Sequence, residues 1–226
     1  MRRPCLPGSN YARLYFSAFM YSQALWFLLL CCALGSGPAS AGNLPQSKYP
    51  DPGQRLRVAG IPNAGRIDEH LYRGAQPREG GLNHLRELGV TTLVDLRGED
   101  SNSREQEKRK AEALGIRFIS IPLGGFSPPA KDQIASFLSL FAGQSPGTVF
   151  VHCRLGEDRT GVFIAAYRIA VDQWTPDEAI KEMDFFGFNR LWHPAMVSYV
   201  RNFPALLNSD PTLRALSSSL RLAESH

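Results

Sequence analysis

Cysteines are scarce in this sequence, and their positions leave little room for disulfide chemistry. Four occur in 226 residues, and three of them, Cys5, Cys31 and Cys32, lie within the first 41 residues. If that segment is removed, Cys153 is the one cysteine left, and no intramolecular disulfide can form. This remaining thiol has to be explained by chemistry or by packing.

Beyond residue 41 the chain also lacks any marked excess of positive charge. The formal net charge is +4, from 25 basic and 21 acidic residues. Three arginines and no acid lie within residues 1–41, which leaves 22 basic against 21 acidic residues in the rest. A nearly neutral body gives no reason to expect nucleic acid as a partner. Any preference for anions must therefore be local.

Long uninterrupted apolar runs are missing except at residues 24–34. Small residues follow this run and end in Ala39-Ser40-Ala41, a pattern typical of signal-peptide cleavage. We therefore predict a signal peptide at residues 1–41 and an exported protein, periplasmic or secreted, that begins at Gly42.

Two alternatives to this cleavage stay open. An uncleaved anchor over residues 14–34 would be about long enough to span a bilayer, although polar residues dilute it. Contact with a membrane is expected only in that case. Translation could also begin at Met20 rather than Met1, but that start would leave no positive residue before the apolar run.

The rest of the chain predicts a linker at residues 42–55, one folded domain at 56–208 and a weakly amphipathic tail at 209–226. The linker is rich in proline, glycine and polar residues. In the domain, strands are expected at 67–74, 91–97, 116–123 and 148–153, and helices at 77–88, 103–114, 131–141, 162–171, 175–185 and 194–207. This alternation predicts an α/β fold with a mainly parallel central sheet flanked by helices.

One stretch, residues 148–161, organises the rest. A β-branched apolar run ends on the pair His152-Cys153, Arg159 follows, and a helix-like apolar run begins after Gly161. A loop between a strand and a helix lies where the helix N-terminus presents free N–H groups and the positive end of its dipole. The stretch therefore predicts an anion-binding site.

The residue types in this loop suit the transfer of a phosphoryl group. A cysteine at a helix N-terminus beside fixed cations exists largely as thiolate. An arginine can hold two phosphate oxygens with its planar fork. A thiolate beneath a phosphate held in this way can attack phosphorus and form a phosphocysteine. A buried cysteine with a packing role is the alternative.

The loop resembles the signature loop of the cysteine-dependent protein tyrosine phosphatase superfamily, and its ending looks most like the atypical dual-specificity branch. It reads His152-Cys153-Arg154-Leu155-Gly156-Glu157-Asp158-Arg159-Thr160-Gly161. Two other segments, residues 72–77 and 94–97, look like parts of bacterial and plant–fungal atypical phosphatases. The resemblance implies that residues 56–208 are a phosphatase catalytic domain.

By this resemblance, Cys153 is the nucleophile and Arg159 clamps the phosphate. Thr160 either bonds the thiolate or starts the helix, and His152 orients the loop from behind, because adjacent residues of a strand point to opposite faces. Gly156 is expected to allow a close approach or a positive φ. The three non-bridging oxygens of the phosphate would be held by the backbone N–H groups of Arg154, Leu155, Gly156, Glu157, Asp158 and Arg159.

The acid that protonates the leaving group is the least determined part of the site. In much of the superfamily an aspartate lies on a loop well before the cysteine, but residues 123–127 contain no acid. The sequence departs there from the family pattern. Asp158 within the loop is the favoured candidate, Asp132 at the start of a helix is the second, and Glu157 is the third.

Four further residues are candidates for supporting roles. Arg73 and Arg97 could touch phosphate or brace the loop, and ordinary structural ion pairs are the alternative. Trp192 and His193 precede a helix that starts with proline, where they could border the pocket or belong to the packing of the core.

The leading prediction is an exported phosphatase that hydrolyses phosphate monoesters on proteins, at phosphotyrosine or with dual specificity. A phosphoinositide or inositol phosphate phosphatase is the first alternative, which the charge of Arg154 slightly favours. A phosphate-binding module that has lost catalysis and a sulfur-transfer enzyme of the rhodanese type represent other classes. No cofactor and no metal are expected, because no His/Asp cluster in the sequence looks like a metal site.

Overall fold

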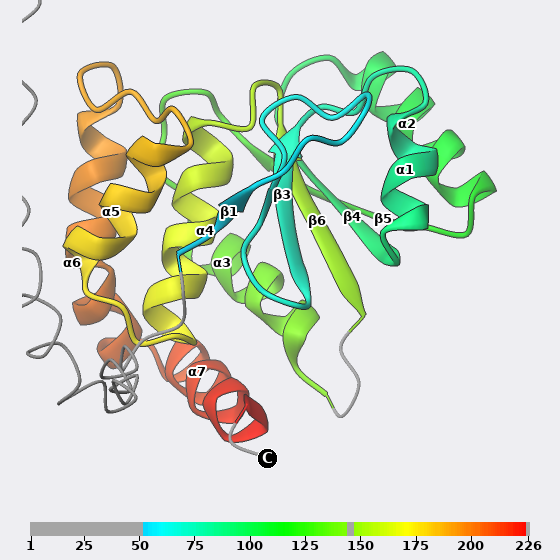
Figure 1. Cartoon of the computed structure of the whole chain (residues 1–226). Helices are drawn as coiled ribbons and strands as arrows, with labels where there is room; N and C mark the ends of the chain where they lie inside the picture. Colours follow the sequence, from blue (N-terminus) through cyan, green and yellow to red (C-terminus); the bar gives the residue numbers. More distant parts are fainter. Residues whose placement is uncertain (1–51, 144–146, 225–226) are drawn as a thin grey trace, which may run out of the picture. The chain divides into compact units, whose positions relative to one another are not determined.

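A six-stranded sheet forms the centre of the protein (Figure 1). The computed structural model describes residues 52–143 and 147–224, so the predicted signal peptide or anchor lies outside the described residues. The strands lie in the order β1-β2-β3-β6-β4-β5. Their bounds are β1 Gln54–Arg55, β2 Gly65–Arg66, β3 Leu71–Ala75, β4 Val90–Arg97, β5 Arg117–Leu123 and β6 Thr148–Cys153.

The larger strands of the sheet run parallel. β3 pairs with β6, β6 with β4, and β4 with β5 in this way, while the short β1 and β2 add antiparallel pairs at one edge. Parallel neighbours need crossover connections, which are usually helices. The predicted α/β fold with a mainly parallel sheet is confirmed.

Helices cover both faces of this sheet (Figure 1). One face carries α1 (Gly81–Glu87) and α2 (Ser101–Ala113), with an apolar cluster beneath them. The larger cluster lies on the other face, under α4 and the helices around it. These are α3 (Lys131–Leu138), the 3-10 helix Ser139–Phe141, α4 (Asp158–Ala170), α5 (Pro176–Phe185), α6 (Pro194–Ser209) and α7 (Pro211–Glu224).

The strand β6 sends alternate side chains to these two faces. Val151 and Cys153 join the larger cluster, and Phe150 joins the cluster beneath α1 and α2. The His152 ring lies on the Phe150 side, with the two ring centroids 5.8 Å apart. His152 and Cys153 therefore point to opposite faces of the sheet, as the strand period requires, and the imidazole does not face the sulfur.

The helix expected at residues 77–88 begins only at Gly81. The backbone N–H of Arg78 bonds the carbonyl of Gly60 instead of starting a helix. Gly80 then has a φ of 76°, a left-handed conformation outside the range of a right-handed helix. Residues 77–80 therefore form a loop beside the sheet edge.

Within the predicted C-terminal tail, Pro211–Glu224 form the helix α7, which packs against α3 and α6. Leu213 and Leu220 are buried there, and the Ser217 hydroxyl donates to the carbonyl of Ala170 at 2.6 Å. The apolar stripe that looked weak in the sequence is buried because two helices accept it. No helix in the described part of the chain combines the length and apolar character needed to cross a membrane.

Candidate active site

The signature loop, defined here as residues 153–159, joins the end of β6 to the start of α4. Cys153 is the last residue of β6, and it is a free thiol with 3% exposure. Asp158 and Arg159 open α4, so the free N–H groups of this helix end face the loop. The fold thus places a thiol at a helix N-terminus, at the edge where the parallel strands end.

The loop turns at Gly156, where a side chain does not fit. Its φ is 72°, in the left-handed region that favours glycine. A Cβ atom at this position would collide with the carbonyl group of Gly74 on β3. The close approach between the loop and β3 therefore depends on this glycine.

Arg159 is nearly buried, and its guanidinium holds a carboxylate. Nη1 donates to Oε2 of Glu99 at 2.6 Å, and Nη2 donates to Oε1 at 2.9 Å. The hydrogen bond from Arg159 is the main cause that holds the pKa of Glu99 at about 2. The fork thus meets two oxygens at once, which is the geometry in which arginine takes a carboxylate or a phosphate.

Glu99 is a residue of the site that the sequence reasoning missed. It follows the end of β4 by two residues, and β4 is the parallel neighbour of β6. Parallel neighbours bring their carboxyl ends to one edge of the sheet, where open α/β sheets bind ligands. That rule finds Glu99 once the strand order is known, but the order is a property of the fold.

Asp158 faces the segment that precedes α6. Its Oδ1 accepts the backbone N–H of Asn189 at 3.0 Å, and its Oδ2 lies 3.3 Å from Nε2 of His193. The buried His193 ring stacks on Phe126, with the centroids 5.1 Å apart. Phe126 belongs to the loop of residues 123–127, so three distant segments of the chain meet at the start of α4.

The other two acid candidates have different surroundings. Asp132 is exposed in the first turn of α3, and within the described part of the chain its side chain has no hydrogen bond or ion pair to the signature loop. Glu157 lies in the loop, where burial, and then the charge of Asp158, raises its pKa. Of the three, Asp158 is the one whose carboxylate lies at ion-pair distance from another side chain among the described residues, that of His193.

Thr160 follows the loop in the first turn of α4. It is fully buried, and its hydroxyl has no hydrogen-bond partner among the described residues. The hydroxyl therefore bonds neither the sulfur of Cys153 nor a carbonyl of the helix start in this structure. Its role in the departure of the thiolate stays a prediction.

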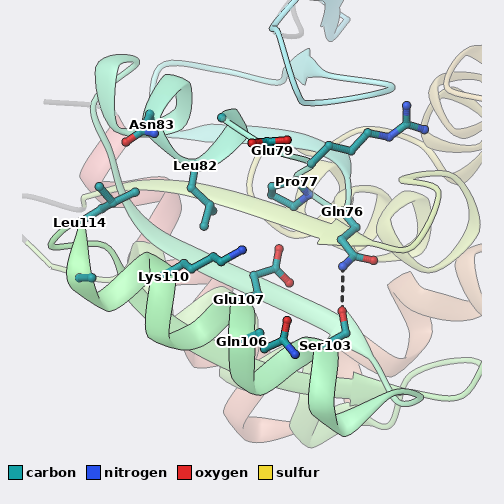
Figure 2. A pocket seen from close by; sticks show the side chains of 13 residues that line it. Gln76, Pro77, Glu79, Leu82, Asn83, Ser103, Gln106, Glu107, Lys110 and Leu114 are labelled. Carbon is teal, nitrogen blue, oxygen red and sulfur yellow. Dashed lines mark hydrogen bonds between the residues drawn. The ribbon is translucent and has the colours of Figure 1, made fainter.

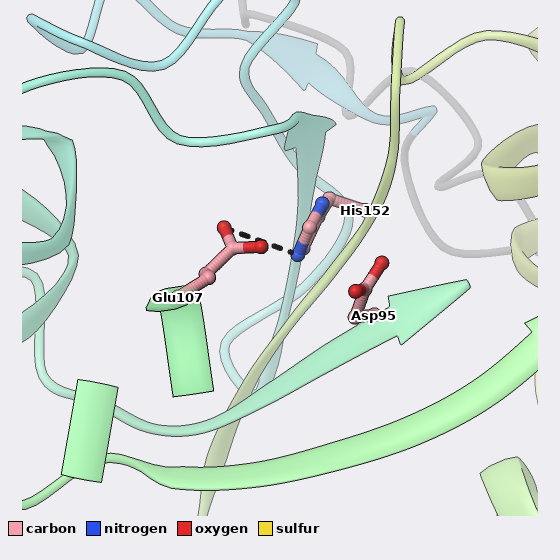
Figure 3. A group of neighbouring side chains, drawn as sticks. All are labelled: Asp95, Glu107 and His152. Atoms are coloured by element: carbon pink, nitrogen blue, oxygen red, sulfur yellow. Dashed lines mark ion pairs between the residues drawn. The ribbon is translucent and has the colours of Figure 1, made fainter. Parts of the chain in front are cut away.

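A buried group of ionisable side chains supports His152 from behind (Figure 3). Arg97 donates from Nε and Nη2 to the two oxygens of Asp95, each at 2.8 Å, and also bonds Glu107. His152 Nε2 lies 3.6 Å from Oε1 of Glu107, and its Nδ1 lies 3.2 Å from the carbonyl oxygen of Cys153. Burial lowers the pKa of His152 to about 4 and raises that of Glu107 to about 7. The imidazole is therefore neutral near pH 7.

This group also has the residue types of a metal site, which the sequence did not reveal. One ligand atom from each of Asp95, Glu107 and His152 lies within 4.8 Å of the others. The guanidinium of Arg97 bonds both carboxylates, so its positive charge already stands where a metal ion would have to bind. The group is accounted for as a buried ion-pair network.

The two arginines whose roles the sequence left open therefore differ. Arg97 belongs to the network behind His152. Arg73, on β3, is fully buried and donates from Nη2 to the carbonyl oxygen of Gly156 within the signature loop. Arg73 braces the loop directly, and Arg97 braces the carboxylates that lie behind it.

Two hollows lie in the surface near residues 76–78, and one of them adjoins the signature loop. One, of about 660 Å³, has Arg154 and Leu155 of the loop in its lining. The other, of about 570 Å³, lies between α1 and α2, where Lys110 and Glu107 extend towards its interior (Figure 2). Both share residues 76–78 as a wall.

Comparisons with proteins of known sequence point to phosphatases. Residues 63–191 match the family model described as "DSP-PTPase phosphatase fused to NAD+ Kinase". The chain is 29% identical over 172 residues to the dual specificity protein phosphatase TpbA of Pseudomonas aeruginosa, over 74% of this chain and 75% of that protein. It is 30% identical over 140 residues to human dual specificity protein phosphatase 26, over 58% of this chain and 64% of that protein.

Solved structures share the fold. The crystal structure of P. aeruginosa TpbA matches with a TM-score of 0.56 and 27% identity, over 78% of this chain and 98% of that one. The core catalytic domain of the S. cerevisiae PP-IP phosphatase SIW14 matches with a TM-score of 0.60, over 72% of this chain and 94% of that one; at 18% identity, this likeness concerns the fold alone. Because the family model spans more than half of the chain and includes the whole signature loop, the protein belongs to the family of cysteine-dependent, dual-specificity-type phosphatases.

Proposed function

We propose that this phosphatase acts on phosphorylated proteins, with Cys153 as nucleophile, Arg159 as phosphate clamp and Asp158 as proton donor. The observation that carries the proposal is the meeting of the thiol, the guanidinium fork and the start of α4 at one edge of the sheet. A thiolate beneath free helix N–H groups and an arginine fork suits a phosphate dianion that is to be attacked at phosphorus.

In the first step, the Cys153 thiolate forms a bond to phosphorus while the bond from phosphorus to the ester oxygen breaks. Backbone N–H groups of the loop and the Arg159 fork hold the non-bridging oxygens. The departing oxygen takes a proton from Asp158, which becomes a carboxylate. The products of this step are an alcohol or phenol and a phosphocysteine.

In the second step, a water molecule attacks phosphorus and the bond from phosphorus to sulfur breaks. The Asp158 carboxylate takes the proton of the attacking water, and Cys153 leaves as a thiolate. In this proposal the hydroxyl of the buried Thr160 donates a hydrogen bond to the thiolate as it leaves. Inorganic phosphate then leaves, and the starting protonation states are restored.

Glu99 competes with a bound phosphate group for Arg159. Its two oxygens accept from both terminal nitrogens of the fork, so a phosphate group that takes these same two donors displaces Glu99. The Glu99 side chain is 45% exposed, and it can move towards solvent without leaving a charge buried. We infer that Glu99 keeps the fork aligned between turnovers and competes with phosphate for it.

Phosphorylated proteins are the favoured substrate class because the relatives at 29–30% identity are named protein phosphatases. A phosphoinositide or inositol phosphate is the second candidate, since Arg78 and Arg154 line the hollow beside the loop and could meet a further phosphate. The test compares kcat/KM for a phosphotyrosine peptide, a phosphoserine peptide and myo-inositol hexakisphosphate. A higher kcat/KM for the inositol phosphate would make inositol phosphates, rather than phosphorylated proteins, the preferred substrate class.

The mechanism is tested with p-nitrophenyl phosphate and Cys153→Ser. We expect the variant to lose at least about 10³-fold in kcat, because the hydroxyl is a far weaker nucleophile than the thiolate. EDTA should leave the wild-type rate unchanged. Activity that survives the substitution, or that EDTA abolishes, would refute the phosphocysteine mechanism.

The proton donor is tested by comparing aryl phosphates with good and poor leaving groups. Asp158→Asn should slow the poor leaving groups about 10²-fold and the good ones much less, because only the former need the proton. Asp132→Asn is the matched control and should change neither. Equal slowing of both substrate types by Asp158→Asn would remove this residue from the role.

We also propose that the mature protein is exported after cleavage between Ala41 and Gly42. The support is the apolar run at residues 24–34 and the small residues that follow it. The intact mass of protein recovered from a secreting host tests this. A mass that still includes residues 1–41 would favour the membrane anchor.

A further inference from the structure

Arg73 is a buried cation beneath the signature loop. Its side chain has no exposed surface, and it lies on β3, the parallel neighbour of β6. In the register of these strands Arg73 is opposite Val151, two residues before Cys153. Burying a guanidinium is costly unless partners compensate its charge and its hydrogen bonds, so this position needs an explanation.

The contacts of Arg73 leave most of its guanidinium unpaired. Nη2 donates to the carbonyl oxygen of Gly156, and the group lies over the Phe186 ring, 4.1 Å from the ring centroid. Nε and Nη1 have no hydrogen-bond partner in the described part of the chain. Within the same residues, Arg73 forms no ion pair with a carboxylate.

The other two fully buried arginines are compensated differently. Arg97 and Arg168 each bond two carboxylates, at the centre of their own ion-pair networks. In each of those networks, the two carboxylates neutralise the positive charge of the arginine. Arg73 has no such counter-charge in direct contact, so its field extends to the groups around it.

Those groups include the nucleophile. Burial lowers the pKa of Arg73 to about 10, and the charges of Glu182 and then Cys153 oppose this fall. The repulsion of Arg55 and the attraction of Glu157 act in addition, with opposite signs. Arg73 therefore stays positive at neutral pH and attracts a negative charge on the sulfur.

We propose that Arg73 is a positioning residue of the phosphatase, which stabilises the Cys153 thiolate from the sheet side and holds the loop in its phosphate-binding shape through Gly156. The inference rests on the proposed nucleophilic role of Cys153. Because Arg73 lies fully beneath the loop, it acts on the substrate only through these two residues.

The test follows the rate at which iodoacetamide inactivates Cys153 between pH 5 and 9. In Arg73→Met, which keeps the volume and loses the charge, the pH profile should move up by about one unit, so inactivation at pH 6 slows about tenfold. Arg73→Lys keeps the charge and should leave the profile within about half a unit of the wild type. Its shorter amine loses the bond to Gly156, so inhibition by inorganic phosphate should weaken several-fold.

Arg168→Lys is the matched control, because it alters a buried arginine whose charge is compensated. It should lower the melting temperature and leave the inactivation profile unchanged. A profile of Arg73→Met that coincides with the wild type would overturn the inference, whatever the loss of stability. If Arg73→Met shows no cooperative melting, Arg73→Lys decides: unchanged inhibition by phosphate would then overturn it.

The test of Arg73 can be told apart from the test of the proposed function. If Cys153→Ser retains wild-type activity, the proposed function fails and the inference fails with it. If Cys153→Ser is inactive while the profile of Arg73→Met is unmoved, the phosphatase mechanism stands and only the role of Arg73 is lost.

Discussion

Arg73 and Arg168 are both fully buried over the face of an aromatic ring, yet their electrostatic surroundings are opposite. Arg168 donates to Asp172 at 2.6 Å and to Glu182 at 2.9 Å, so two anions face one cation. Arg73 donates to a neutral carbonyl in the signature loop and contacts no carboxylate among the described residues. One arginine is at the centre of a structural network, and the other lies beneath the reacting group.

The difference shows which buried charges maintain the fold and which serve the site. Removing one member of a compensated network has a large cost, because the partners that remain are buried charges without a counter-charge. An uncompensated cation costs stability while it is present, and such groups persist where an anion is to be formed or bound. Substitutions in the network around Arg168 should therefore change stability, whereas substitutions at Arg73 should change the reactivity of Cys153.

The largest effect on stability is expected at the compensated arginine. Arg168→Met leaves Asp172 and Glu182 without their partner and should lower the free energy of unfolding by about 3–5 kcal/mol. Urea denaturation measures this loss. Adding Glu182→Gln should recover part of it, and kcat per folded molecule should be unchanged. A loss of activity at equal folded fraction would place Arg168 in the site and erase the contrast with Arg73.

The pH dependence of stability sharpens the comparison through the carboxyls of the two networks. Burial raises the pKa of Glu107 to about 7 and that of Asp172 to about 6, above the ordinary values of 4.5 and 3.8. The folded protein then binds more protons than the unfolded chain. The two carboxyls therefore stabilise the folded state fully below about pH 4, and this stabilisation is lost as the pH rises through 6 to 7.

His152 acts in the opposite direction. Its pKa falls from 6.5 to about 4, so its contribution is present above pH 6.5 and is lost as the pH drops through 4. Between about pH 4.5 and 7 the two carboxyls together lose more stabilisation than His152 gains, so the melting temperature should decline over this range. Glu107→Gln should flatten the decline between pH 5 and 7. If the melting temperature of Glu107→Gln declines as in the wild type, other groups cause the decline.

A smaller effect is expected at the ring beneath Arg73. Phe186→Leu removes the cation–π contact and part of the packing, and should cost about 1–2 kcal/mol of unfolding free energy. Phe185→Leu is the matched control, because that ring is 51% exposed and its loss should cost less than about 0.5 kcal/mol. Equal losses in chemical denaturation would mean that the contact with Arg73 contributes little.

The smallest effect is expected at Glu99. Glu99→Gln removes a charge that competes for Arg159, so inorganic phosphate should inhibit about two- to fivefold more strongly, which suits a half-exposed ion pair. With a pKa of about 2, Glu99 stays ionised, so the ratio to the wild type should be constant from pH 5 to 8. Glu105→Gln, on the exposed side of α2, is the control. Weaker inhibition by inorganic phosphate in Glu99→Gln would mean that Glu99 mainly aligns Arg159.

Much of the site could be predicted from the sequence because its parts are covalently close. The strand β6, the turn at Gly156 and the helix α4 follow each other within residues 148–170, and local preferences fix each of them. The alternation of strands and helices likewise predicted the fold class. The helix α7 is harder to predict from the sequence, because its weak apolar stripe is buried only through contact with α3 and α6.

By itself, the sequence determined the chemistry of the loop: a thiol and an arginine at fixed spacing around a helix N-terminus. Only the tertiary structure decided what surrounds that chemistry. Glu99 reaches Arg159, His193 reaches Asp158 and Arg73 bonds Gly156 from beneath without a contacting carboxylate, because strand order and helix packing bring together segments far apart in the chain. Spacing along the chain fixes local geometry, whereas the charge environment sums over every group that the fold places within a few ångströms.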